Sequence, residues 1–378
     1  MKRFFYFFIL FSLLLSPAAH AEALRDGEIA IQAPSAILME KYTGEILYEK
    51  NAHERIFPAS VTKIMTMLLI VEDIESGRLA LDDTVTASAR AASFGGSCVY
   101  LEEGEKMSVD DMLKCIAVVS ANDCAVAMAE HISGTEQLFV ERMNRRAAEL
   151  GLSDTHFTGC TGLFDDGEHY TSAYDVAVMS RELIRHELIK GYTTIWMDSI
   201  REGKFELSNT NKLVYWYEGC TGLKTGYTST AMYCLSATAE REGVEYIAVI
   251  MHGESINSRN NDAKTLLNYA FASYTLCPLQ ALELPDIPVE LGRAASLRCA
   301  YEGSEYALRA KSGEIPEYKL TLPESVTAPV ELGARLGSVQ VILGGELLRE
   351  LPVVAAESVA KLGYFGLWGR LALSLFGL

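Results

Sequence analysis

The sequence has no run of basic residues beyond its first three positions, and its overall charge is acidic. Of 378 residues, 33 are Lys or Arg and 50 are Asp or Glu, so the formal net charge is -17. Sequence-independent binding of nucleic acid needs clustered cations that displace counterions from phosphates. The composition therefore argues against a nucleic-acid partner. Hydrophobic residues make up 49% of the chain, which predicts a sizeable core and excludes a disordered or fibrous protein.

Metal-binding patterns are also absent. No Cys-x-x-Cys pair occurs, and His and Cys do not cluster with the spacing of a zinc site. We therefore expect no metal and no cofactor. The eight cysteines stand at positions 98, 115, 124, 160, 220, 234, 277 and 299. Several of them lie in apolar stretches, as Cys115 does, which favours buried free thiols, and no pairing follows from the sequence.

The only long apolar run at the N-terminus is too short to span a membrane. It extends from Phe4 to Leu15, after Lys2 and Arg3, and a small-x-small site follows at Ala19-His20-Ala21. A membrane span needs roughly 20 apolar residues. We therefore predict a signal peptide over residues 1–21 and an exported protein, with an N-terminal membrane anchor as the alternative.

The order of the predicted elements indicates an α+β domain over residues 22–276. A strand hairpin is expected over 36–49, a helix over 59–72, mostly helices over 108–190, three strands over 221–228, 231–239 and 244–252, and a helix over 259–274. Strands at both ends of a helical region are not the alternating pattern of a parallel sheet. Short strands between Gly and Pro turns then predict a small all-β domain over residues 277–352.

The last segment, residues 353–378, is expected to form an amphipathic helix. Arg370 lies in the middle of its apolar part, and a charge at the centre of a bilayer is costly. An interfacial helix instead places Arg370 at the headgroups and Phe365, Trp368 and Phe376 among the acyl chains. We therefore predict attachment to a membrane surface, with a helix docked on its own domain as the alternative.

Ser60-Val-Thr-Lys63 begins the first long helix and combines a hydroxyl with an amine. Residues three apart share one helix face, so the Lys63 amine can reach the Ser60 hydroxyl. A serine is a poor nucleophile until a base takes its proton. A lysine becomes such a base when its surroundings lower its pKa, and the apolar neighbours Ile64 and Met65 make such surroundings plausible. The pair is therefore a candidate nucleophile with its base.

Two further polar motifs fall in the same domain. Ser120-Ala-Asn122 lies at an apolar turn between helices, and Lys224-Thr-Gly226 lies within a predicted strand. Each motif is weak alone, because similar patterns occur elsewhere, at Ser358–Lys361, Ser255–Asn257, Ser258–Asn260 and Lys311–Gly313. The set Ser60/Lys63, Ser120/Asn122 and Lys224/Thr225/Gly226 is distinguished because it lies inside a single α+β domain.

In this order and context, the three motifs resemble those of the low-molecular-mass penicillin-binding proteins of the serine-type D-alanyl-D-alanine carboxypeptidase family. Longer matches support the resemblance, and they are Phe57–Thr66, Ser120–Asp123, Gly162-Leu, His169–Asp175, Asn209–Asn211 and Gly222–Thr228. The resemblance implies a β-lactamase/transpeptidase-like domain, with helices on both sides of an antiparallel five-stranded sheet. It also implies a small all-β sandwich domain and a C-terminal amphipathic helix.

The same resemblance implies catalytic roles. Ser60 attacks the carbonyl between two D-alanines and forms an acyl-enzyme. Lys63 is the general base and also activates the hydrolytic water. Ser120 relays a proton towards the leaving D-alanine, and Asn122 holds the substrate amide and helps to position Lys63.

Substrate-binding roles follow in the same way. Lys224 supplies positive potential and Thr225 binds the terminal carboxylate, to which Arg259 adds. Gly226 lets a peptide lie alongside its strand. The backbone N–H groups of the nucleophile and of Tyr227 form an oxyanion hole.

The predicted function is removal of the terminal D-alanine from peptidoglycan stem peptides, with covalent binding of penicillin and other β-lactams. The predicted location is the outer face of the bacterial cytoplasmic membrane. A DD-endopeptidase or a β-lactamase on the same fold is an alternative, although the Asp165–Glu168 loop does not resemble the class A β-lactamase motif. A non-catalytic wall-binding scaffold is another, and loss of Ser60 or Lys63 would favour it.

Overall fold

The computed structural model describes residues 29–163, 167–278, 282–301, 306–310 and 316–364, together with 366 and 368. The chain forms two compact units. Among the described residues, one comprises 29–278 and 306–310, and the other comprises 282–301 and 316–364 with 366 and 368. The predicted signal peptide, residues 1–21, lies outside the described residues.

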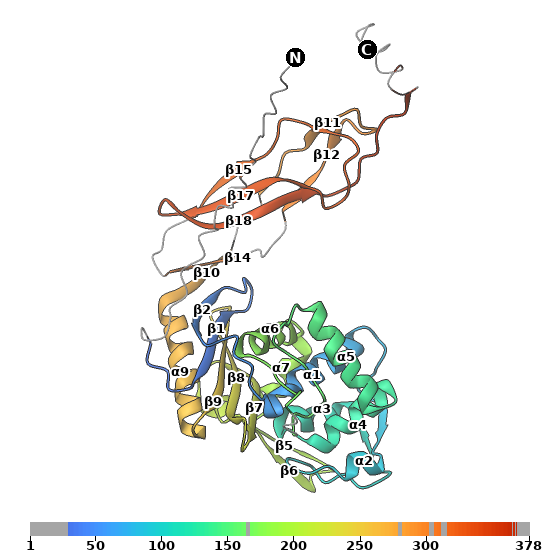
Figure 1. The fold of residues 1–378 in the computed structure, drawn as a ribbon, viewed down its shortest axis with the longest axis vertical. Helices are drawn as coiled ribbons and strands as arrows, with labels where there is room; N and C mark the ends of the chain where they lie inside the picture. Colours follow the sequence, from blue (N-terminus) through green and yellow to red (C-terminus); the bar gives the residue numbers. More distant parts are fainter. Residues whose placement is uncertain are drawn as a thin grey trace, which may run out of the picture. The chain divides into compact units, whose positions relative to one another are not determined.

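A five-stranded sheet forms the centre of the larger unit (Figure 1). Its order is β2-β1-β9-β8-β7, and every neighbouring pair is antiparallel. The strands are β1 (Ser35–Glu40), β2 (Ile46–Lys50), β7 (Cys220–Thr228), β8 (Met232–Arg241) and β9 (Val244–Gly253). The hairpin and the three later strands expected from the sequence are confirmed. Strand β1 lies between β2 and β9, and β7 is an edge strand of the sheet.

Each face of the sheet has its own hydrophobic core, because successive side chains in a strand point to opposite faces. Ile37 and Met39 of β1 join the core that contains α1 (Lys63–Glu75) and α6 (Ala173–Leu183). Ala36 and Leu38 join the core with α9 (Ile256–Ser273). Figure 1 shows α9 on one side of the sheet and α6 on the other. The expected arrangement of helices on both sides is confirmed.

Five of the remaining helices pack together on the α1 side of the sheet. They are α2 (Ala89–Ala92), α3 (Val109–Val118), α4 (Asn122–Ser133), α5 (Glu136–Glu149) and α7 (Glu187–Thr193), with the hairpins β3 (Thr84–Thr86)–β4 (Lys106–Ser108) and β5 (Met197–Ile200)–β6 (Phe205–Ser208). Leu213 of the short helix α8 (Leu213–Trp216) instead joins the core with α9. Hydroxyl caps define several helix starts, since Ser108 accepts from the Asp111 N–H and Ser172 from the Asp175 N–H. Helix α4 has no side-chain cap, and its start belongs to the candidate site.

The smaller unit is an all-β sandwich. One sheet contains β11 (Ile287–Glu290), β12 (Ser296–Leu297) and β16 (Val326–Thr327), and the other contains β13 (Cys299–Tyr301), β15 (Glu317–Thr321), β17 (Arg335–Leu343) and β18 (Glu346–Ala355). Leu297, Val330 and Ala355 belong to its buried core. One strand within the bounds predicted for this domain, 277–352, groups with the larger unit: β14 (Tyr306–Ala310) pairs with β10 (Tyr274–Pro278).

The C-terminal helix does not begin at residue 353 as expected. Val353 and Val354 belong to β18, where they pair with β17 and β13, and Val359 forms a bridge with Val330. Ala355 and Val359 belong to the core of the sandwich, so the beginning of the predicted segment is part of the all-β domain. Most of the predicted apolar helix, including residues 365 and 369–378, lies outside the described residues. Within the part of the chain that is described, no helix is long and apolar enough to span a bilayer.

Candidate active site

Ser60 and Lys63 lie at one helix start, as the sequence predicts. Ser60 is in a short 3-10 helix, Ala59–Thr62, that leads directly into α1. The Lys63 amine donates to Ser60 Oγ at 2.9 Å, and the lysine is fully buried. Burial lowers the pKa of Lys63 from 10.5 to about 7, because a charged amine is costly away from water. Near neutral pH the amine is therefore able to accept a proton.

Two oxygens hold the Lys63 amine in place. It donates to Asn122 Oδ1 at 2.6 Å and to the Thr161 carbonyl at 2.9 Å. Asn122 was predicted as a partner of this lysine. The Thr161 carbonyl was not, because a backbone oxygen has no signature in a sequence. Its nearest signal was the adjacent Gly162-Leu match.

The Ser120–Asn122 turn forms one wall of the site, next to Ser60 and Lys63. Ser120 is buried with a φ of +64°, and its Oγ has no hydrogen-bond partner among the described residues. Its hydroxyl is thus available to a substrate or a water. The Asn122 amide also donates to the Gly95 carbonyl at 2.7 Å, and the Asn122 backbone N–H donates to the Ser97 carbonyl at 2.7 Å. These bonds fix which end of the Asn122 side chain faces Lys63.

A buried carboxylate supports that wall. Asp123 is 1% exposed and accepts from the backbone N–H groups of Val99, Leu101 and Cys124, at 2.9 to 3.3 Å. Such bonds satisfy a buried charge without a counter-ion. Asp123 therefore ties the loop that carries Gly95 to the start of α4.

Strand β7 supplies another wall of the site. Thr225 Oγ1 donates to Thr210 Oγ1 at 2.8 Å, so the Asn209–Asn211 segment lies against this strand. A side-chain carbon built at Gly226 would lie 3.1 Å from the Ser60 backbone N and 3.0 Å from the Pro58 carbonyl oxygen. Real side chains rarely approach a backbone this closely, so glycine allows β7 and the helix start to meet.

Two basic side chains, Lys224 on β7 and Arg259 on α9, are buried and interact electrostatically. Lys224 is buried and donates to the Thr225 carbonyl at 3.0 Å. Burial, with the charges of Lys63 and Arg259, lowers the pKa of the Lys224 amine well below 10.5. Arg259 donates to the Cys234 carbonyl at 3.2 Å, and burial lowers its pKa to about 10. This region would favour a bound anion, because an anion would compensate the unfavourable burial of these cations.

Tyr227 differs from its neighbours because its side chain is 55% exposed. Its ring lies 4.4 Å from that of Tyr233, which follows on β8. The side chain is therefore at the surface, and the role predicted for Tyr227 concerns its backbone N–H alone.

The structure also separates the genuine Ser-x-x-Lys pair from the second match. Val359 and Lys361 form β-bridges with Val330 and Gly292, so this stretch is extended rather than helical. Ser358 Oγ accepts from the Leu332 backbone N–H at 3.2 Å. Residues three apart do not share a face in an extended chain, so Ser358 has a structural role.

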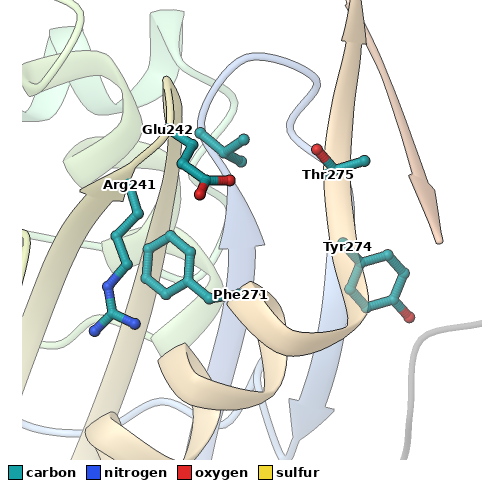
Figure 2. A pocket seen from close by; sticks show the side chains of 6 residues that line it. Arg241, Glu242, Phe271, Tyr274 and Thr275 are labelled. Carbon is teal, nitrogen blue, oxygen red and sulfur yellow. The ribbon is translucent and has the colours of Figure 1, made fainter. Parts of the chain in front are cut away.

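A shallow pocket elsewhere in the larger unit contains none of these residues (Figure 2). It is lined by Arg241, Glu242, Val244, Phe271, Tyr274 and Thr275. The Arg241 guanidinium packs 4.5 Å from the centre of the Phe271 ring and donates to the Glu218 carbonyl. Arg241 and Tyr274 already have partners here, and the lining contains no Ser–Lys pair.

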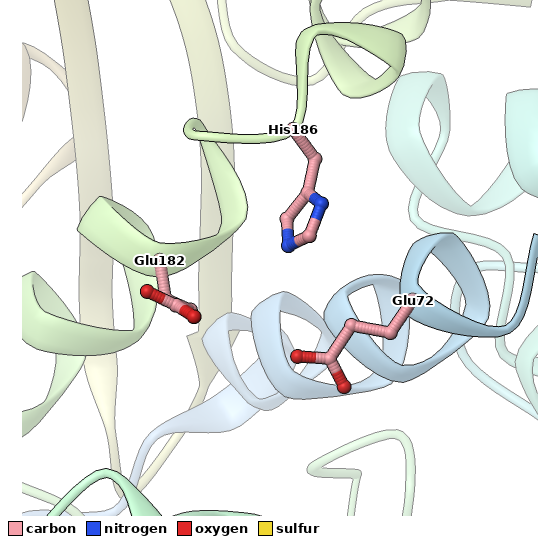
Figure 3. A group of neighbouring side chains, drawn as sticks. All are labelled: Glu72, Glu182 and His186. Atoms are coloured by element: carbon pink, nitrogen blue, oxygen red, sulfur yellow. The ribbon is translucent and has the colours of Figure 1, made fainter. Parts of the chain in front are cut away.

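One group of described residues has a geometry that could hold a cation: Glu72, Glu182 and His186 (Figure 3). Arg146 already donates to both carboxylates, at 2.9 Å each. His186 Nδ1 lies 2.7 Å from Glu75 Oε2. A guanidinium therefore balances this acidic charge, and the group does not require a metal.

Comparison with protein families finds two matches. A family model described as D-alanyl-D-alanine carboxypeptidase matches residues 19–255, and one described as the penicillin-binding protein 5 C-terminal domain matches residues 302–361. D-alanyl-D-alanine carboxypeptidase DacF of Bacillus subtilis is 41% identical to this chain over 375 residues, which is 96% of each protein.

Solved structures agree with these matches. Penicillin-binding protein 5 from Haemophilus influenzae superposes with a TM-score of 0.78 at 29% identity, covering 88% of this chain and 98% of that one. Penicillin-binding protein D2 from Listeria monocytogenes, in its ampicillin-bound form, superposes with a TM-score of 0.59 at 29% identity. That match covers 64% of this chain and 98% of the Listeria chain.

Proposed function

Because this chain belongs to the D-alanyl-D-alanine carboxypeptidase family, we propose that it removes the terminal D-alanine from peptidoglycan stem peptides through an acyl-enzyme on Ser60. The observation that carries this proposal is the buried Lys63 amine, 2.9 Å from Ser60 Oγ. A base with a pKa near the working pH is the most effective general base.

Acylation begins when the neutral Lys63 amine takes the Ser60 proton and Oγ attacks the carbonyl between the two D-alanines. The resulting oxyanion accepts from the backbone N–H groups of Ser60 and Tyr227. The carbon–nitrogen bond then breaks, and the leaving D-alanine nitrogen receives the proton held by Lys63, relayed through the buried Ser120 hydroxyl, so that Lys63 is neutral again. The products of this half-reaction are free D-alanine and an ester on Ser60.

Deacylation reuses the same base. A water donates its proton to Lys63 and attacks the ester carbonyl, and the alkoxide of Ser60 recovers its proton as the ester bond breaks. The stem peptide leaves with one D-alanine fewer. Asn122 and the Thr161 carbonyl keep the amine aimed at the reacting atoms in both steps, since each accepts one of its N–H groups.

The substrate carboxylate is proposed to bind at β7. Lys224 and Arg259 are buried, and neither forms a salt bridge with a carboxylate of the described residues. Thr225 Oγ1 lies on the same edge strand, beside Thr210. A terminal carboxylate would lower the cost of burying these charges. A substrate with a free carboxylate next to the cleaved bond, as in a peptide that ends in D-Ala-D-Ala, meets this requirement.

Covalent binding of β-lactams follows from the same chemistry. Ser60 would open the lactam ring and keep the acyl group, as the ampicillin-bound state of the Listeria relative supports. The chain is also proposed to be exported and held at the outer face of the cytoplasmic membrane by residues near its C-terminus. The composition of residues 1–21 and 362–378 supports this location.

The test is D-alanine release from a diacyl-Lys-D-Ala-D-Ala tripeptide by the detergent-solubilised full chain, with labelling by a fluorescent penicillin in parallel. Release and labelling should both vanish in Ser60→Ala and persist in Ser358→Ala, the matched control at the second Ser-x-x-Lys. Labelling without release in the wild type would contradict the carboxypeptidase and favour a β-lactam sensor or an endopeptidase. Neither signal in a folded wild type would leave the scaffold alternative.

A further inference from the structure

His169 is buried close to the candidate nucleophile, and both of its ring nitrogens have partners. Nδ1 lies 3.0 Å from the Thr158 backbone N, and Nε2 lies 2.8 Å from Thr62 Oγ1. A backbone N–H can only donate, so Nδ1 must be the acceptor. In the neutral ring the hydrogen is therefore on Nε2, which donates to the Thr62 hydroxyl.

The Thr62 hydroxyl links His169 by hydrogen bonds to Ala59, the residue before the nucleophile. It donates to the Ala59 carbonyl at 2.8 Å while it accepts from His169. Ala59 is fully buried with a φ of +48°, a left-handed conformation that residues other than glycine rarely adopt. Such a conformation persists when its surroundings hold it. The hydrogen bond from Thr62 is one contact that does so.

Gly162 closes the space around that carbonyl. Its φ is +68°, and a side-chain carbon built there would lie 1.9 Å from the Ala59 oxygen and 2.4 Å from Thr62 Oγ1. The Gly162 backbone therefore packs directly on the Thr62–Ala59 hydrogen bond. A larger residue at position 162 would therefore displace the hydroxyl or the carbonyl.

The Ala59 carbonyl and the Ser60 N–H belong to one planar peptide unit and point in opposite directions. Holding the carbonyl therefore aims the N–H. The Ser60 nitrogen faces β7, as the 3.1 Å distance from a carbon built at Gly226 shows. We propose that His169, acting through Thr62, orients the Ala59–Ser60 peptide and thereby aims the Ser60 N–H at the oxyanion. His169 is thus a positioning residue, and this inference rests on the proposed acyl-enzyme function.

The variants that test it remove or keep single hydrogen bonds. Thr62→Val replaces the hydroxyl by a methyl group of similar size, and Thr62→Ser keeps the hydroxyl. His169→Leu removes the donor. His156→Leu is the matched control, because His156 forms an isolated β-bridge with Tyr170, the neighbour of His169, and its ring contacts the Glu168 carbonyl instead.

Each variant is measured for thermal stability, for the fraction of active sites titrated by fluorescent penicillin, and for kcat and KM of D-alanine release per active site. An oxyanion forms only in the transition state, so a misaimed donor lowers kcat and leaves KM nearly unchanged. Thr62→Val and His169→Leu should lose about tenfold or more in kcat, since losing such a donor outright costs roughly 10²–10³-fold. Affinity for a peptide boronate, whose oxygen occupies the oxyanion position, should fall by a similar factor.

Rescue and failure have distinct signatures. Thr62→Ser and His156→Leu should retain kcat and boronate affinity close to those of the wild type. Wild-type kcat per active site in Thr62→Val overturns the inference, as does an equal loss in Thr62→Ser. If the wild-type chain is never acylated, the proposed function is wrong, and this inference fails with it. If the wild type is acylated normally and the variants behave like it, only this inference is wrong.

Discussion

Lys63 Nζ lies 2.9 Å from Ser60 Oγ in a position where the lysine is fully buried. Removing the amine should abolish acylation, because the serine then has no base. For Lys63→Ala we expect a loss of about 10²–10⁴-fold in the rate of penicillin acylation. Lys63→Arg should lose as much, since a guanidinium keeps its proton at neutral pH. Stopped-flow acylation measures both, and near-normal acylation in Lys63→Arg would show that charge, not basicity, is required.

The pH dependence of acylation should follow the shifted pKa of Lys63. Burial lowers this pKa from 10.5 to about 7, and only the neutral amine accepts the Ser60 proton. The rate should therefore rise as pH increases through about 7 and level off above it. The check is the pH profile of kcat/KM for D-alanine release, which reports the free enzyme. A profile still rising steeply at pH 9 would assign the base a pKa near the ordinary value for lysine.

The same shift affects stability, with a definite sign. Between pH 7 and 10.5 the unfolded chain keeps a proton on Lys63 that the folded chain has released. The unfolded state then binds more protons, so the free energy of unfolding contributed by this group rises with pH across that window. Urea unfolding of the wild type and Lys63→Met at several pH values isolates the contribution. An identical pH slope in both proteins would contradict it.

Gly226→Ala should impair acylation more than folding. The new methyl group would lie 3.0 to 3.1 Å from backbone atoms of Pro58, Ser60 and Val61. It would shift β7 relative to the nucleophile, and displacements of about 1 Å can cost roughly 10²-fold in rate. Gly191→Ala is the control, because its added carbon meets nothing within 4 Å and lies in helix α7. Equal acylation rates in both variants would refute the close approach.

Asp123→Asn should destabilise the larger unit. The carboxylate accepts hydrogen bonds from three backbone N–H groups. The amide NH₂ of an Asn is a donor, so it would face at least one of these N–H groups without bonding to it. Losing hydrogen bonds to a buried charged group costs about 1.5–3 kcal/mol. Denaturant unfolding should show this loss, whereas the exposed Asp82→Asn should stay within about 0.5 kcal/mol of the wild type. The loop that carries Gly95 would also be held less firmly. The Asn122 side chain, which bonds to the Gly95 carbonyl and to Lys63, would then be less well positioned, so kcat should fall.

Truncation should separate the sandwich from the proposed membrane attachment. A chain that ends at Gly363 keeps β18 and the Val330–Val359 bridge, whereas one that ends at Pro352 loses Val353–Ala355. The first should appear in the soluble fraction of fractionated cells with full penicillin labelling and unchanged thermal stability. The second should lose the sandwich transition in calorimetry. Sedimentation of the first with membranes would show that the attachment lies elsewhere.

Much of this architecture is local and could be predicted. Alternation and turn residues placed β7, β8 and β9 within one or two residues, because a strand's side-chain period is a property of neighbouring residues. The Ser60–Lys63 contact is similarly local, since one helical turn brings the two side chains together. The predicted start of the C-terminal helix failed at Val353 because an apolar run there fits a buried strand as well as a helix, and one of its pairing partners, Tyr301 on β13, lies far away in the sequence.

The residue order was enough to identify the reactive pair, the accompanying motifs and the family, because side-chain chemistry and short-range periodicity are carried by consecutive residues. Folding brings the rest together. It places the Thr161 carbonyl on Lys63, the β7 backbone beside the Ser60 N–H, and His169 behind Thr62. These contacts join distant segments, and several use backbone atoms that every residue possesses. No sequence pattern marks them, so they exist only once the sheet and the helices have packed.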